Sequence, residues 1–262
     1  LFLKEQTERF GTSHTYAADT FIEMTPPSGD LEYLGNLGRA IYDGMARTDP
    51  QAVWVLQTWI FLNKRHYWTQ DRIQAFLGAV ANEKMIALDL FCETQPQWSR
   101  TNAFYGKPWL WCNVQTFGGV VQLGGAMPRN AEGLPATRKD PKSGDLAGLG
   151  FVNEALGVNP PVYDLMFEMA WRDDPVDLNV WFRDYARHRY GRTNDKAEAA
   201  WGILKSTVYT SPFRSHSVVQ RVPSLRALGG AAYDNVLLAQ AWKHRWTRRT
   251  NSATPTRSGS TS

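Results

Sequence analysis

Two glutamates follow strand-like segments and are the residues best suited to acid–base chemistry. Glu23 lies in "YAADTFIEMTPP", where a strand-like run meets a Pro-rich break, and Glu154 follows an apolar stretch in "DLAGLGFVNEALGVNP". Carboxylates at the carboxyl ends of barrel strands are typical of catalytic residues, and a pair of them suits hydrolysis of a glycosidic bond. The alternative is that both are ordinary surface acids among 25 Asp and Glu.

The composition indicates a globular protein with many aromatic residues. The chain has 262 residues, of which 43% are hydrophobic and 21% charged, and it contains 11 Trp, 10 Tyr and 12 Phe. Aromatic side chains stack on sugar rings, on nucleobases or on each other, and a core rich in aromatic residues explains them equally well. Aromatic content alone therefore leaves the ligand open.

The positive charge does not predict a nucleic-acid-binding protein. The net charge is +4, and the basic residues gather only in "KHRWTRRT", residues 243–250. A Ser/Thr-rich tail follows, so a helix end and then a disordered segment at 248–262 are expected. No apolar run approaches the length of a membrane helix, and we expect neither a nucleic-acid nor a membrane partner.

Neither cofactors nor metals are predicted. Cys92 and Cys112 cannot form a disulfide framework and lack metal-ligand spacing, and the five histidines are scattered. No strand is followed by a Gly-x-Gly-x-x-Gly or Gly-Lys-Ser/Thr loop. The first residues, "LFLKEQTERFG", lack the layout of a signal peptide and resemble the last turns of a helix closed by Gly11, so the chain is expected to begin within a domain.

Strand-like and helical patterns alternate up to about residue 160. The alternation of apolar strands with helices indicates a parallel α/β fold, for which barrel and Rossmann architectures both fit. The expected strands are Ser13–Phe21, Ala52–Phe61, Lys84–Phe91 and Pro108–Phe117, and the expected helices are Asp30–Ala46 and Thr69–Val80.

Beyond Glu154 the chain becomes helical throughout. Helices are expected after the prolines of Pro160–Trp171, in Asp177–Gly191, which ends at its glycine, in Asp195–Tyr209 and in Tyr233–Trp246. We therefore predict three parts, which are a partial barrel at 1–165, an incomplete α-helical domain at 166–247 and the tail at 248–262.

Six ordered motifs carry a family resemblance. They are "YAADTFIEMTPP", "AVWVLQTWIF", "LDLFCETQPQWSRT", "PWLWCNVQTFGG", "NPPVYDLMFEMAWR" and "RYG". Over residues 1 to about 245 the chain resembles glycoside hydrolase family 89, the α-N-acetylglucosaminidases. The resemblance implies the C-terminal portion of a (β/α)8 TIM-type barrel, followed by the start of an α-helical domain.

The resemblance also implies a reaction. Members of this family release terminal α-linked N-acetylglucosamine from heparan sulfate or mucin-type glycans with retention of configuration, and their location is lysosomal or extracellular. Glu23 falls on the family's acid/base and Glu154 on its nucleophile. A retaining mechanism requires carboxyl groups roughly 5 to 5.5 Å apart. The oligomeric state is left open.

Other residues match the family with less definite roles. Trp59 is expected to stack on the sugar or to belong to the barrel core, and Trp111 and Asn113 are candidates to line the pocket. Asp89 and Glu93 suit a hydrogen-bonding scaffold as well as a substrate contact. For Asp19, Tyr163 and Trp171 a structural role is favoured.

Several positions depart from the family pattern. Ile22 replaces an Asn, Gln115 and Thr116 replace a His and an Asn, Asn153 and Ala155 flank the second glutamate in place of Pro and Gly, and Val222 replaces an Arg. Lost polar contacts predict altered specificity or weakened activity, since each buried hydrogen bond contributes about 1 to 3 kcal/mol.

Three alternatives follow from the sequence. The chain is a fragment of an active enzyme, with little activity by itself, or a degenerate relative that binds sugar. The third alternative is an unrelated scaffold or basic interaction module, for which salt-dependent binding of polyanions is the test.

Overall fold

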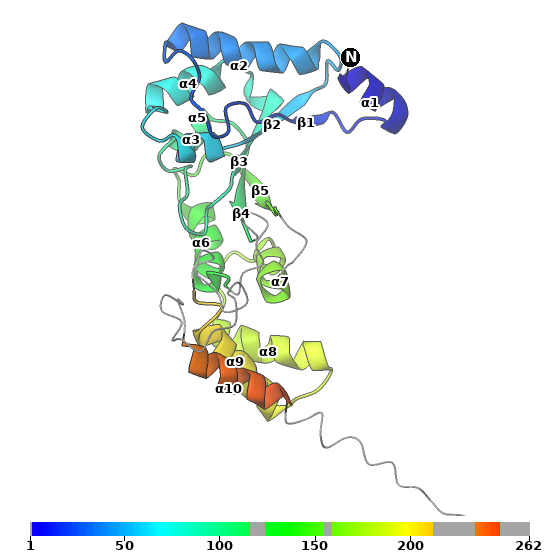
Figure 1. Ribbon diagram of the computed structural model, residues 1–262, viewed down its shortest axis with the longest axis vertical. Helices are drawn as coiled ribbons and strands as arrows, with labels where there is room; N and C mark the ends of the chain where they lie inside the picture. Colours follow the sequence, from blue (N-terminus) through cyan, green and yellow to red (C-terminus); the bar gives the residue numbers. More distant parts are fainter. Residues whose placement is uncertain (1, 116–123, 155–158, 212–233, 247–262) are drawn as a thin grey trace, which may run out of the picture. The chain divides into compact units, whose positions relative to one another are not determined.

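A computed structural model describes residues 2–115, 124–154, 159–211 and 234–246. Five parallel strands form one sheet in the order β1-β2-β3-β4-β5 (Figure 1). The strands are β1 (Thr15–Ala17), β2 (Val53–Gln57), β3 (Met85–Asp89), β4 (Trp109–Asn113) and β5 (Leu146–Phe151). The order follows the sequence, as in a barrel, and this part of the chain is an α/β fold with a partial barrel.

Helices connect successive strands, which a parallel sheet requires. They are α2 (Leu31–Ala46), α3 (Trp59–Asn63), α4 (Gln70–Gly78), the 3-10 turn Asn82–Lys84, the left-handed turn α5 (Asn102–Tyr105) and α6 (Met127–Lys139). Helices α2 and α4 pack against each other (Figure 1). Among the helices that the structure describes, none has both the length and the apolar character needed to cross a membrane.

The predicted helices begin and end close to the expected residues. Asp30 is the N-cap of α2, and its carboxylate accepts a hydrogen bond from the Tyr33 backbone nitrogen at 2.8 Å. Thr69 is the N-cap residue of α4 but makes no side-chain capping bond. The opening helix α1 (Phe2–Phe10) ends at Gly11, whose φ of 74° is the left-handed conformation expected of a closing glycine.

The sheet buries one face against its helices. Trp54 and Leu56 on β2 are fully buried, and the Trp54 ring meets the Phe76 ring of α4 edge-on at 5.7 Å. Side chains on the opposite face, such as Val55 and Leu88, are half-buried. This alternation is the period-2 pattern of a strand, and it places the core between the sheet and α2–α4.

Three sequence expectations were wrong. The strand expected at Ser13–Phe21 is confined to Thr15–Ala17, and the chain turns at Phe21, which has a φ of 55°. The strand expected to run from Ala52 to Phe61 stops at Gln57. Thr58 leaves the extended conformation, with φ −79° and ψ 6°, its hydroxyl donates to the Leu88 carbonyl, and α3 begins at Trp59. The helix α6 was not expected at all. Its sequence contains Pro135, which removes a backbone donor from the helix interior.

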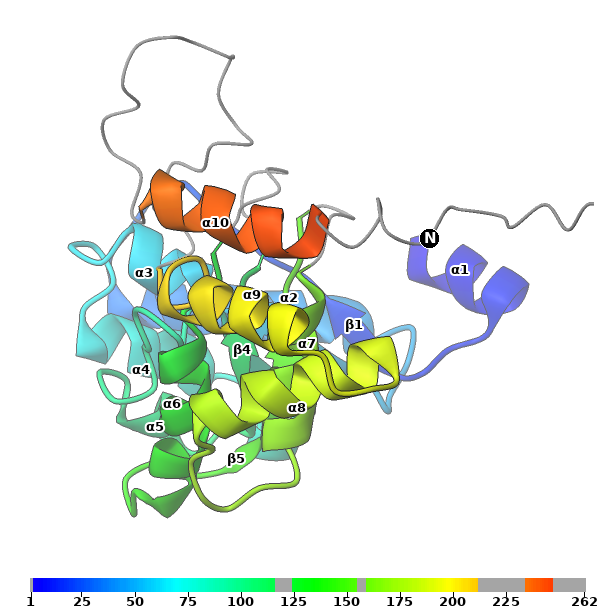
Figure 2. The ribbon, with the colours of Figure 1, turned by 90° about the horizontal axis from the view of Figure 1, so that it is seen from below.

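The later helices form an aromatic bundle. They are α7 (Pro160–Met169), α8 (Leu178–Tyr190), α9 (Asp195–Ser206) and α10 (Asn235–Trp246). Helix α9 packs against both α8 and α10 (Figure 2). Between α8 and α9 the Tyr185 and Trp201 rings meet at 4.8 Å. Gly191 ends α8 with a φ of 66°, as the sequence predicts.

The chain divides into two compact units. The first comprises residues 1–114, 133–153 and 169–173, and the second comprises 115–132, 154–168 and 174–262. The division at residue 165 that the sequence suggests stays a prediction. The predicted tail, 248–262, lies outside the described residues.

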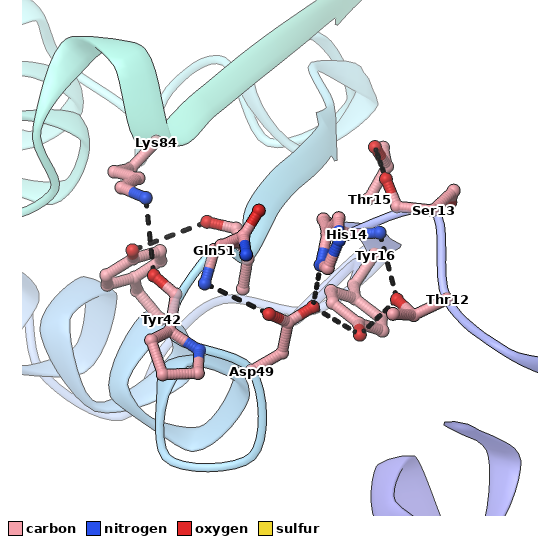
Figure 3. A network of polar contacts seen from close by, with 11 residues as sticks. Thr12, Ser13, His14, Thr15, Tyr16, Tyr42, Asp49, Gln51 and Lys84 are labelled. Atoms are coloured by element: carbon pink, nitrogen blue, oxygen red, sulfur yellow. Dashed lines mark hydrogen bonds and ion pairs between the residues drawn. The ribbon is translucent and has the colours of Figure 1, made fainter. Parts of the chain in front are cut away.

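A polar network fixes the amino ends of β1 and β2 (Figure 3). Asp49 is buried, and its Oδ2 lies 2.8 Å from His14 Nδ1 and accepts a hydrogen bond from the Tyr16 hydroxyl at 2.8 Å. Its Oδ1 accepts from the Gln51 backbone nitrogen. Burial raises the pKa of Asp49, but the bonds from His14, Tyr16 and Gln51 outweigh that effect and hold the pKa below its usual range.

Candidate active site

Glu23 lies in a turn beyond the carboxyl end of β1. Phe21 begins this turn with a φ of 55°, and the Met24 backbone nitrogen donates to the Phe21 carbonyl at 3.3 Å. Glu23 is exposed, and so are Ile22 and Met24, which expose 39% and 66% of their surfaces. In the described part of the chain these apolar neighbours therefore do not shield the Glu23 carboxyl from water.

The turn that carries Glu23 is attached to β2 and α3. Asp19 Oδ1 accepts a hydrogen bond from the Gln57 backbone nitrogen at 2.9 Å, and Trp54 Nε1 donates to the Ala18 carbonyl at 2.8 Å. Asp19 is half-buried. Burial raises its pKa, and the hydrogen bond from Gln57 opposes that rise. Asp19 thus has a structural contact of the kind expected from the sequence.

Trp59 is the first residue of α3, immediately beyond the carboxyl end of β2. Its ring lies 5.4 Å from that of Phe91, with the two planes tilted by 49°, and its side chain is half-buried. Half-burial at this edge of the sheet is compatible with a platform for a sugar ring. The role of Trp59 in substrate binding stays a prediction.

Asp89 ends β3 and organises the loop that follows. Its Oδ2 accepts hydrogen bonds from the backbone nitrogens of Gln97 and Trp98, both at 2.8 Å. Asp89 is fully buried, which raises its pKa to about 6 although these bonds oppose the rise. The geometry gives Asp89 a scaffold role, and Glu93 in the same loop is also buried.

The two cysteines lie beside this loop. Cys92 and Cys112 are both buried free thiols, and the Cys92 backbone nitrogen donates to the Cys112 carbonyl at 3.1 Å. Burial raises the pKa of each thiol, and the nearby Asp89 carboxylate raises it further. Within the described ranges no cluster of three or more His, Cys, Asp or Glu could hold a metal ion.

Trp111 and Asn113 lie on β4 and are both buried. Trp111 exposes 1% of its surface and packs toward α6, where a Cβ at Gly133 would lie 3.3 Å from its ring. Such burial favours a core role for Trp111. Asn113 is the last residue of β4, and its carbonyl accepts a bond from the Val152 nitrogen. Both remain candidates to line a pocket.

Glu154 comes three residues after the end of β5. It is exposed and belongs to the second unit, whereas Glu23 belongs to the first. The two glutamates thus follow the two edge strands of the sheet. Their expected separation of roughly 5 to 5.5 Å stays a prediction.

The remaining sequence candidates have varied surroundings. Gln115 exposes 2% of its surface, and its Oε1 has no hydrogen-bond partner in the part of the chain that the structure describes. Tyr163 is half-buried on α7. Trp171 lies in the turn after α7 and exposes 90% of its surface, and the structural role favoured for it stays a prediction. Thr116, Ala155 and Val222 lie outside the described residues.

The first unit therefore has the architecture of a barrel enzyme. Its strands are parallel, they follow one another in sequence order, and acidic and aromatic side chains follow their carboxyl ends. Comparison with known proteins identifies the particular family. Residues 1–173 match the family model "Alpha-N-acetylglucosaminidase (NAGLU) tim-barrel domain", and residues 181–256 match the corresponding C-terminal domain. The chain belongs to the α-N-acetylglucosaminidase family.

Individual relatives agree with this assignment. The chain is 41% identical over 249 residues to human alpha-N-acetylglucosaminidase. The aligned region covers 93% of this chain and 33% of the human protein. The chain thus spans about a third of that relative's length. A family 89 glycoside hydrolase from Clostridium perfringens, solved with its substrate GlcNAc-alpha-1,4-galactose, matches with a TM-score of 0.75 and 27% identity over 93% of this chain and 27% of that chain.

A second structure of a Clostridium perfringens family 89 enzyme has 2-acetamido-1,2-dideoxynojirmycin bound. It matches with the same TM-score of 0.75 and 27% identity, over 93% of this chain and 28% of that chain. The structural match and the sequence match therefore agree on the family and on the partial coverage.

Proposed function

We propose that this chain is part of a retaining glycoside hydrolase that releases terminal α-linked N-acetylglucosamine from glycans. The observation that carries the proposal is the family match together with two glutamates, Glu23 and Glu154, that follow strands of one parallel sheet. The bacterial relative solved with its substrate carries two Glu-to-Gln substitutions. That substitution pattern supports a chemistry that depends on two carboxyl groups.

The proposed reaction has two steps. Protonated Glu23 donates its proton to the leaving glycosidic oxygen while the Glu154 carboxylate attacks the anomeric carbon, so the C–O bond breaks as a glycosyl ester forms. The ionised Glu23 then removes a proton from water, and that water attacks the same carbon and releases the sugar and the Glu154 carboxylate. Two inversions give net retention.

The proposed reaction requires the Glu23 carboxyl to be shielded from water, and the residues of this chain that the structure describes do not provide that shielding. A general acid at neutral pH requires a raised pKa, which burial provides. Glu23 is exposed here, and one face of the sheet is only half-buried. We therefore expect the 262-residue chain by itself to turn over slowly, and the same residues within a whole barrel to be the active species.

Release of 4-nitrophenol from 4-nitrophenyl α-N-acetylglucosaminide tests the proposal. The full-length gene product, Glu23→Gln, Glu154→Gln and a control at the exposed Glu132, Glu132→Gln, should be compared. We expect Glu154→Gln to lower kcat by more than about 10³-fold and Glu132→Gln to leave it unchanged. Proton NMR of the first-formed sugar should show the α anomer. Full activity of Glu154→Gln, or the β anomer, would refute the retaining assignment.

A sugar-binding relative with little turnover is the second candidate. Ile22 replaces the family's Asn beside the acid/base and exposes 39% of its surface, so an apolar side chain lies where a hydrogen-bonding one is expected. A protein that binds N-acetylglucosamine in titration calorimetry but releases no nitrophenol would favour this candidate.

A further inference from the structure

We propose that Asp19 is a positioning residue for Glu23, because its carboxylate attaches the turn that carries Glu23 to the end of β2. This inference rests on the proposed function, since it concerns Glu23 as the acid/base. It adds a residue whose role is separate from proton transfer and from sugar binding.

The Asp19 side chain accepts a backbone hydrogen bond just beyond the point where the backbone pairing between β1 and β2 ends. The strands are in parallel register at Ala17 and Val55, and the Ala18 nitrogen still donates to the Val55 carbonyl at 3.4 Å. Beyond that point the Gln57 nitrogen donates to Asp19 Oδ1 at 2.9 Å. A carboxylate thus occupies the position of a ladder carbonyl, and bonds to a charged acceptor are stronger than neutral ones.

Two further bonds hold the same turn. Trp54 Nε1 donates to the Ala18 carbonyl at 2.8 Å, and Asn63 Nδ2 donates to the Ile22 carbonyl at 3.4 Å. The donors come from β2 and from the last residue of α3. Residues 18, 19 and 22 are therefore all hydrogen-bonded to β2 or α3 shortly before Glu23.

The turn itself needs such support. Phe21 has a φ of 55°, a conformation that is unfavourable for a bulky residue and persists only when its surroundings enforce it. Without the Asp19 bond, the chain between Ala18 and Met24 could relax Phe21 toward negative φ. That relaxation would move Glu23 by an ångström or more, and a displacement of about 1 Å costs on the order of 10²-fold in rate.

The contact that Asp19 makes fits it poorly for acid catalysis. Its Oδ1 faces a backbone nitrogen, so protonation there would break the bond. Asp19→Asn keeps an oxygen acceptor for Gln57, whereas Asp19→Ala removes it. The pair of variants thus separates loss of the bond from loss of the charge.

The readout is the dependence of rate on the leaving group. 4-Nitrophenol leaves without protonation, whereas the galactose hydroxyl of GlcNAc-α-1,4-galactose requires the acid. In the full-length gene product, kcat and KM should be measured on both substrates for Asp19→Ala, Asp19→Asn, Asn63→Ala, Glu23→Gln and the exposed control Glu32→Gln. We expect Asp19→Ala to lose about 10²-fold in kcat/KM on the disaccharide and less than about 3-fold on the nitrophenyl substrate. The comparison is made on kcat/KM because it reports the first step, whereas the second step also uses Glu23 and is common to both substrates.

The outcomes separate the two proposals. Asp19→Asn should stay within about 3-fold of wild type on both substrates, and Asn63→Ala should show a smaller loss confined to the disaccharide. If Glu23→Gln shows no leaving-group selectivity, Glu23 is not the acid and the proposed function fails. If Glu23→Gln is selective but Asp19→Ala slows both substrates equally, only the positioning role is refuted. Should Asp19→Ala not fold, an unselective Asn63→Ala or a raised KM for Asp19→Asn refutes it.

Discussion

Asp89 closes the loop after β3 by accepting a hydrogen bond from the Gln97 backbone nitrogen at 2.8 Å. The Trp98 nitrogen donates to the same carboxylate oxygen at the same distance. Because Asp89 is fully buried, its removal leaves the buried Gln97 donor and the partly buried Trp98 donor without their acceptor. An unsatisfied buried group costs about 1 to 3 kcal/mol, so we expect Asp89→Ala to lower the free energy of unfolding by several kcal/mol, measured by urea denaturation.

The raised pKa of Asp89 predicts a pH dependence of stability. A carboxyl with a folded-state pKa of about 6 and an unfolded value of 3.8 stabilises the fold when protonated, and this contribution is lost as the pH rises through 6. The full difference is about 3 kcal/mol. We expect urea midpoints between pH 4 and 7 to show this loss and Asp89→Asn to abolish it. An unchanged slope in Asp89→Asn, with Glu32→Gln as control, would contradict the assignment.

Asp49 predicts the opposite dependence at lower pH. Its pKa is held below 3.8 by His14, Tyr16 and Gln51, so its contribution to stability is present above pH 3.8 and is lost as the pH falls through the folded pKa. We expect Asp49→Asn to flatten the acid limb of the unfolding profile below pH 4. An acid limb that stays as steep as in wild type would show that other groups control it.

Much of the fold could be predicted from the sequence, because local patterns determine it. The 3.6-residue periodicity predicts α2, and Gly191 correctly marks the end of α8. The other element boundaries depend on contacts between residues far apart in the sequence, which local patterns do not reveal. The run "TWIF" has the composition of a strand, yet Thr58 bonds to Leu88 and ends β2 before Trp59.

The candidate site could likewise be predicted only where local sequence patterns determine it. Both glutamates and their strands could be found in the sequence, whereas the attachment of Asp19 to Gln57 joins residues 38 positions apart. Helix α6 was missed because its sequence contains Gly133 and Pro135. Its start is fixed by a bond from the Met127 nitrogen to the Tyr209 carbonyl, which no local pattern reveals.

Trp59 and Trp111 should respond differently to truncation. Trp59 is half-buried at the sheet edge, so Trp59→Ala is expected to raise KM for the nitrophenyl substrate by about 10-fold or more, with unfolding changed little. Trp111 is buried against α6, so Trp111→Ala should destabilise the fold by about 3 to 5 kcal/mol. Equal effects of the two variants on KM would contradict this division.

Ile22→Asn tests whether the departure from the family pattern weakens the enzyme. An amide at this position could hydrogen-bond the sugar, and one such bond contributes about 1 to 3 kcal/mol. We expect kcat/KM on the nitrophenyl substrate to rise by about 5- to 150-fold. Ile22→Val is the matched control. A fall in kcat/KM for Ile22→Asn would indicate that Ile22 contributes to a different specificity.

The proposed reaction requires Glu154 to form a glycosyl ester during turnover. Mass spectrometry detects this ester in peptides from the full-length gene product after reaction with a slow, fluorinated α-N-acetylglucosaminyl fluoride. We expect one added sugar on the peptide that contains Glu154, and none in Glu154→Gln. A label on a different carboxylate, or steady turnover of this fluoride without any labelled peptide, would contradict it.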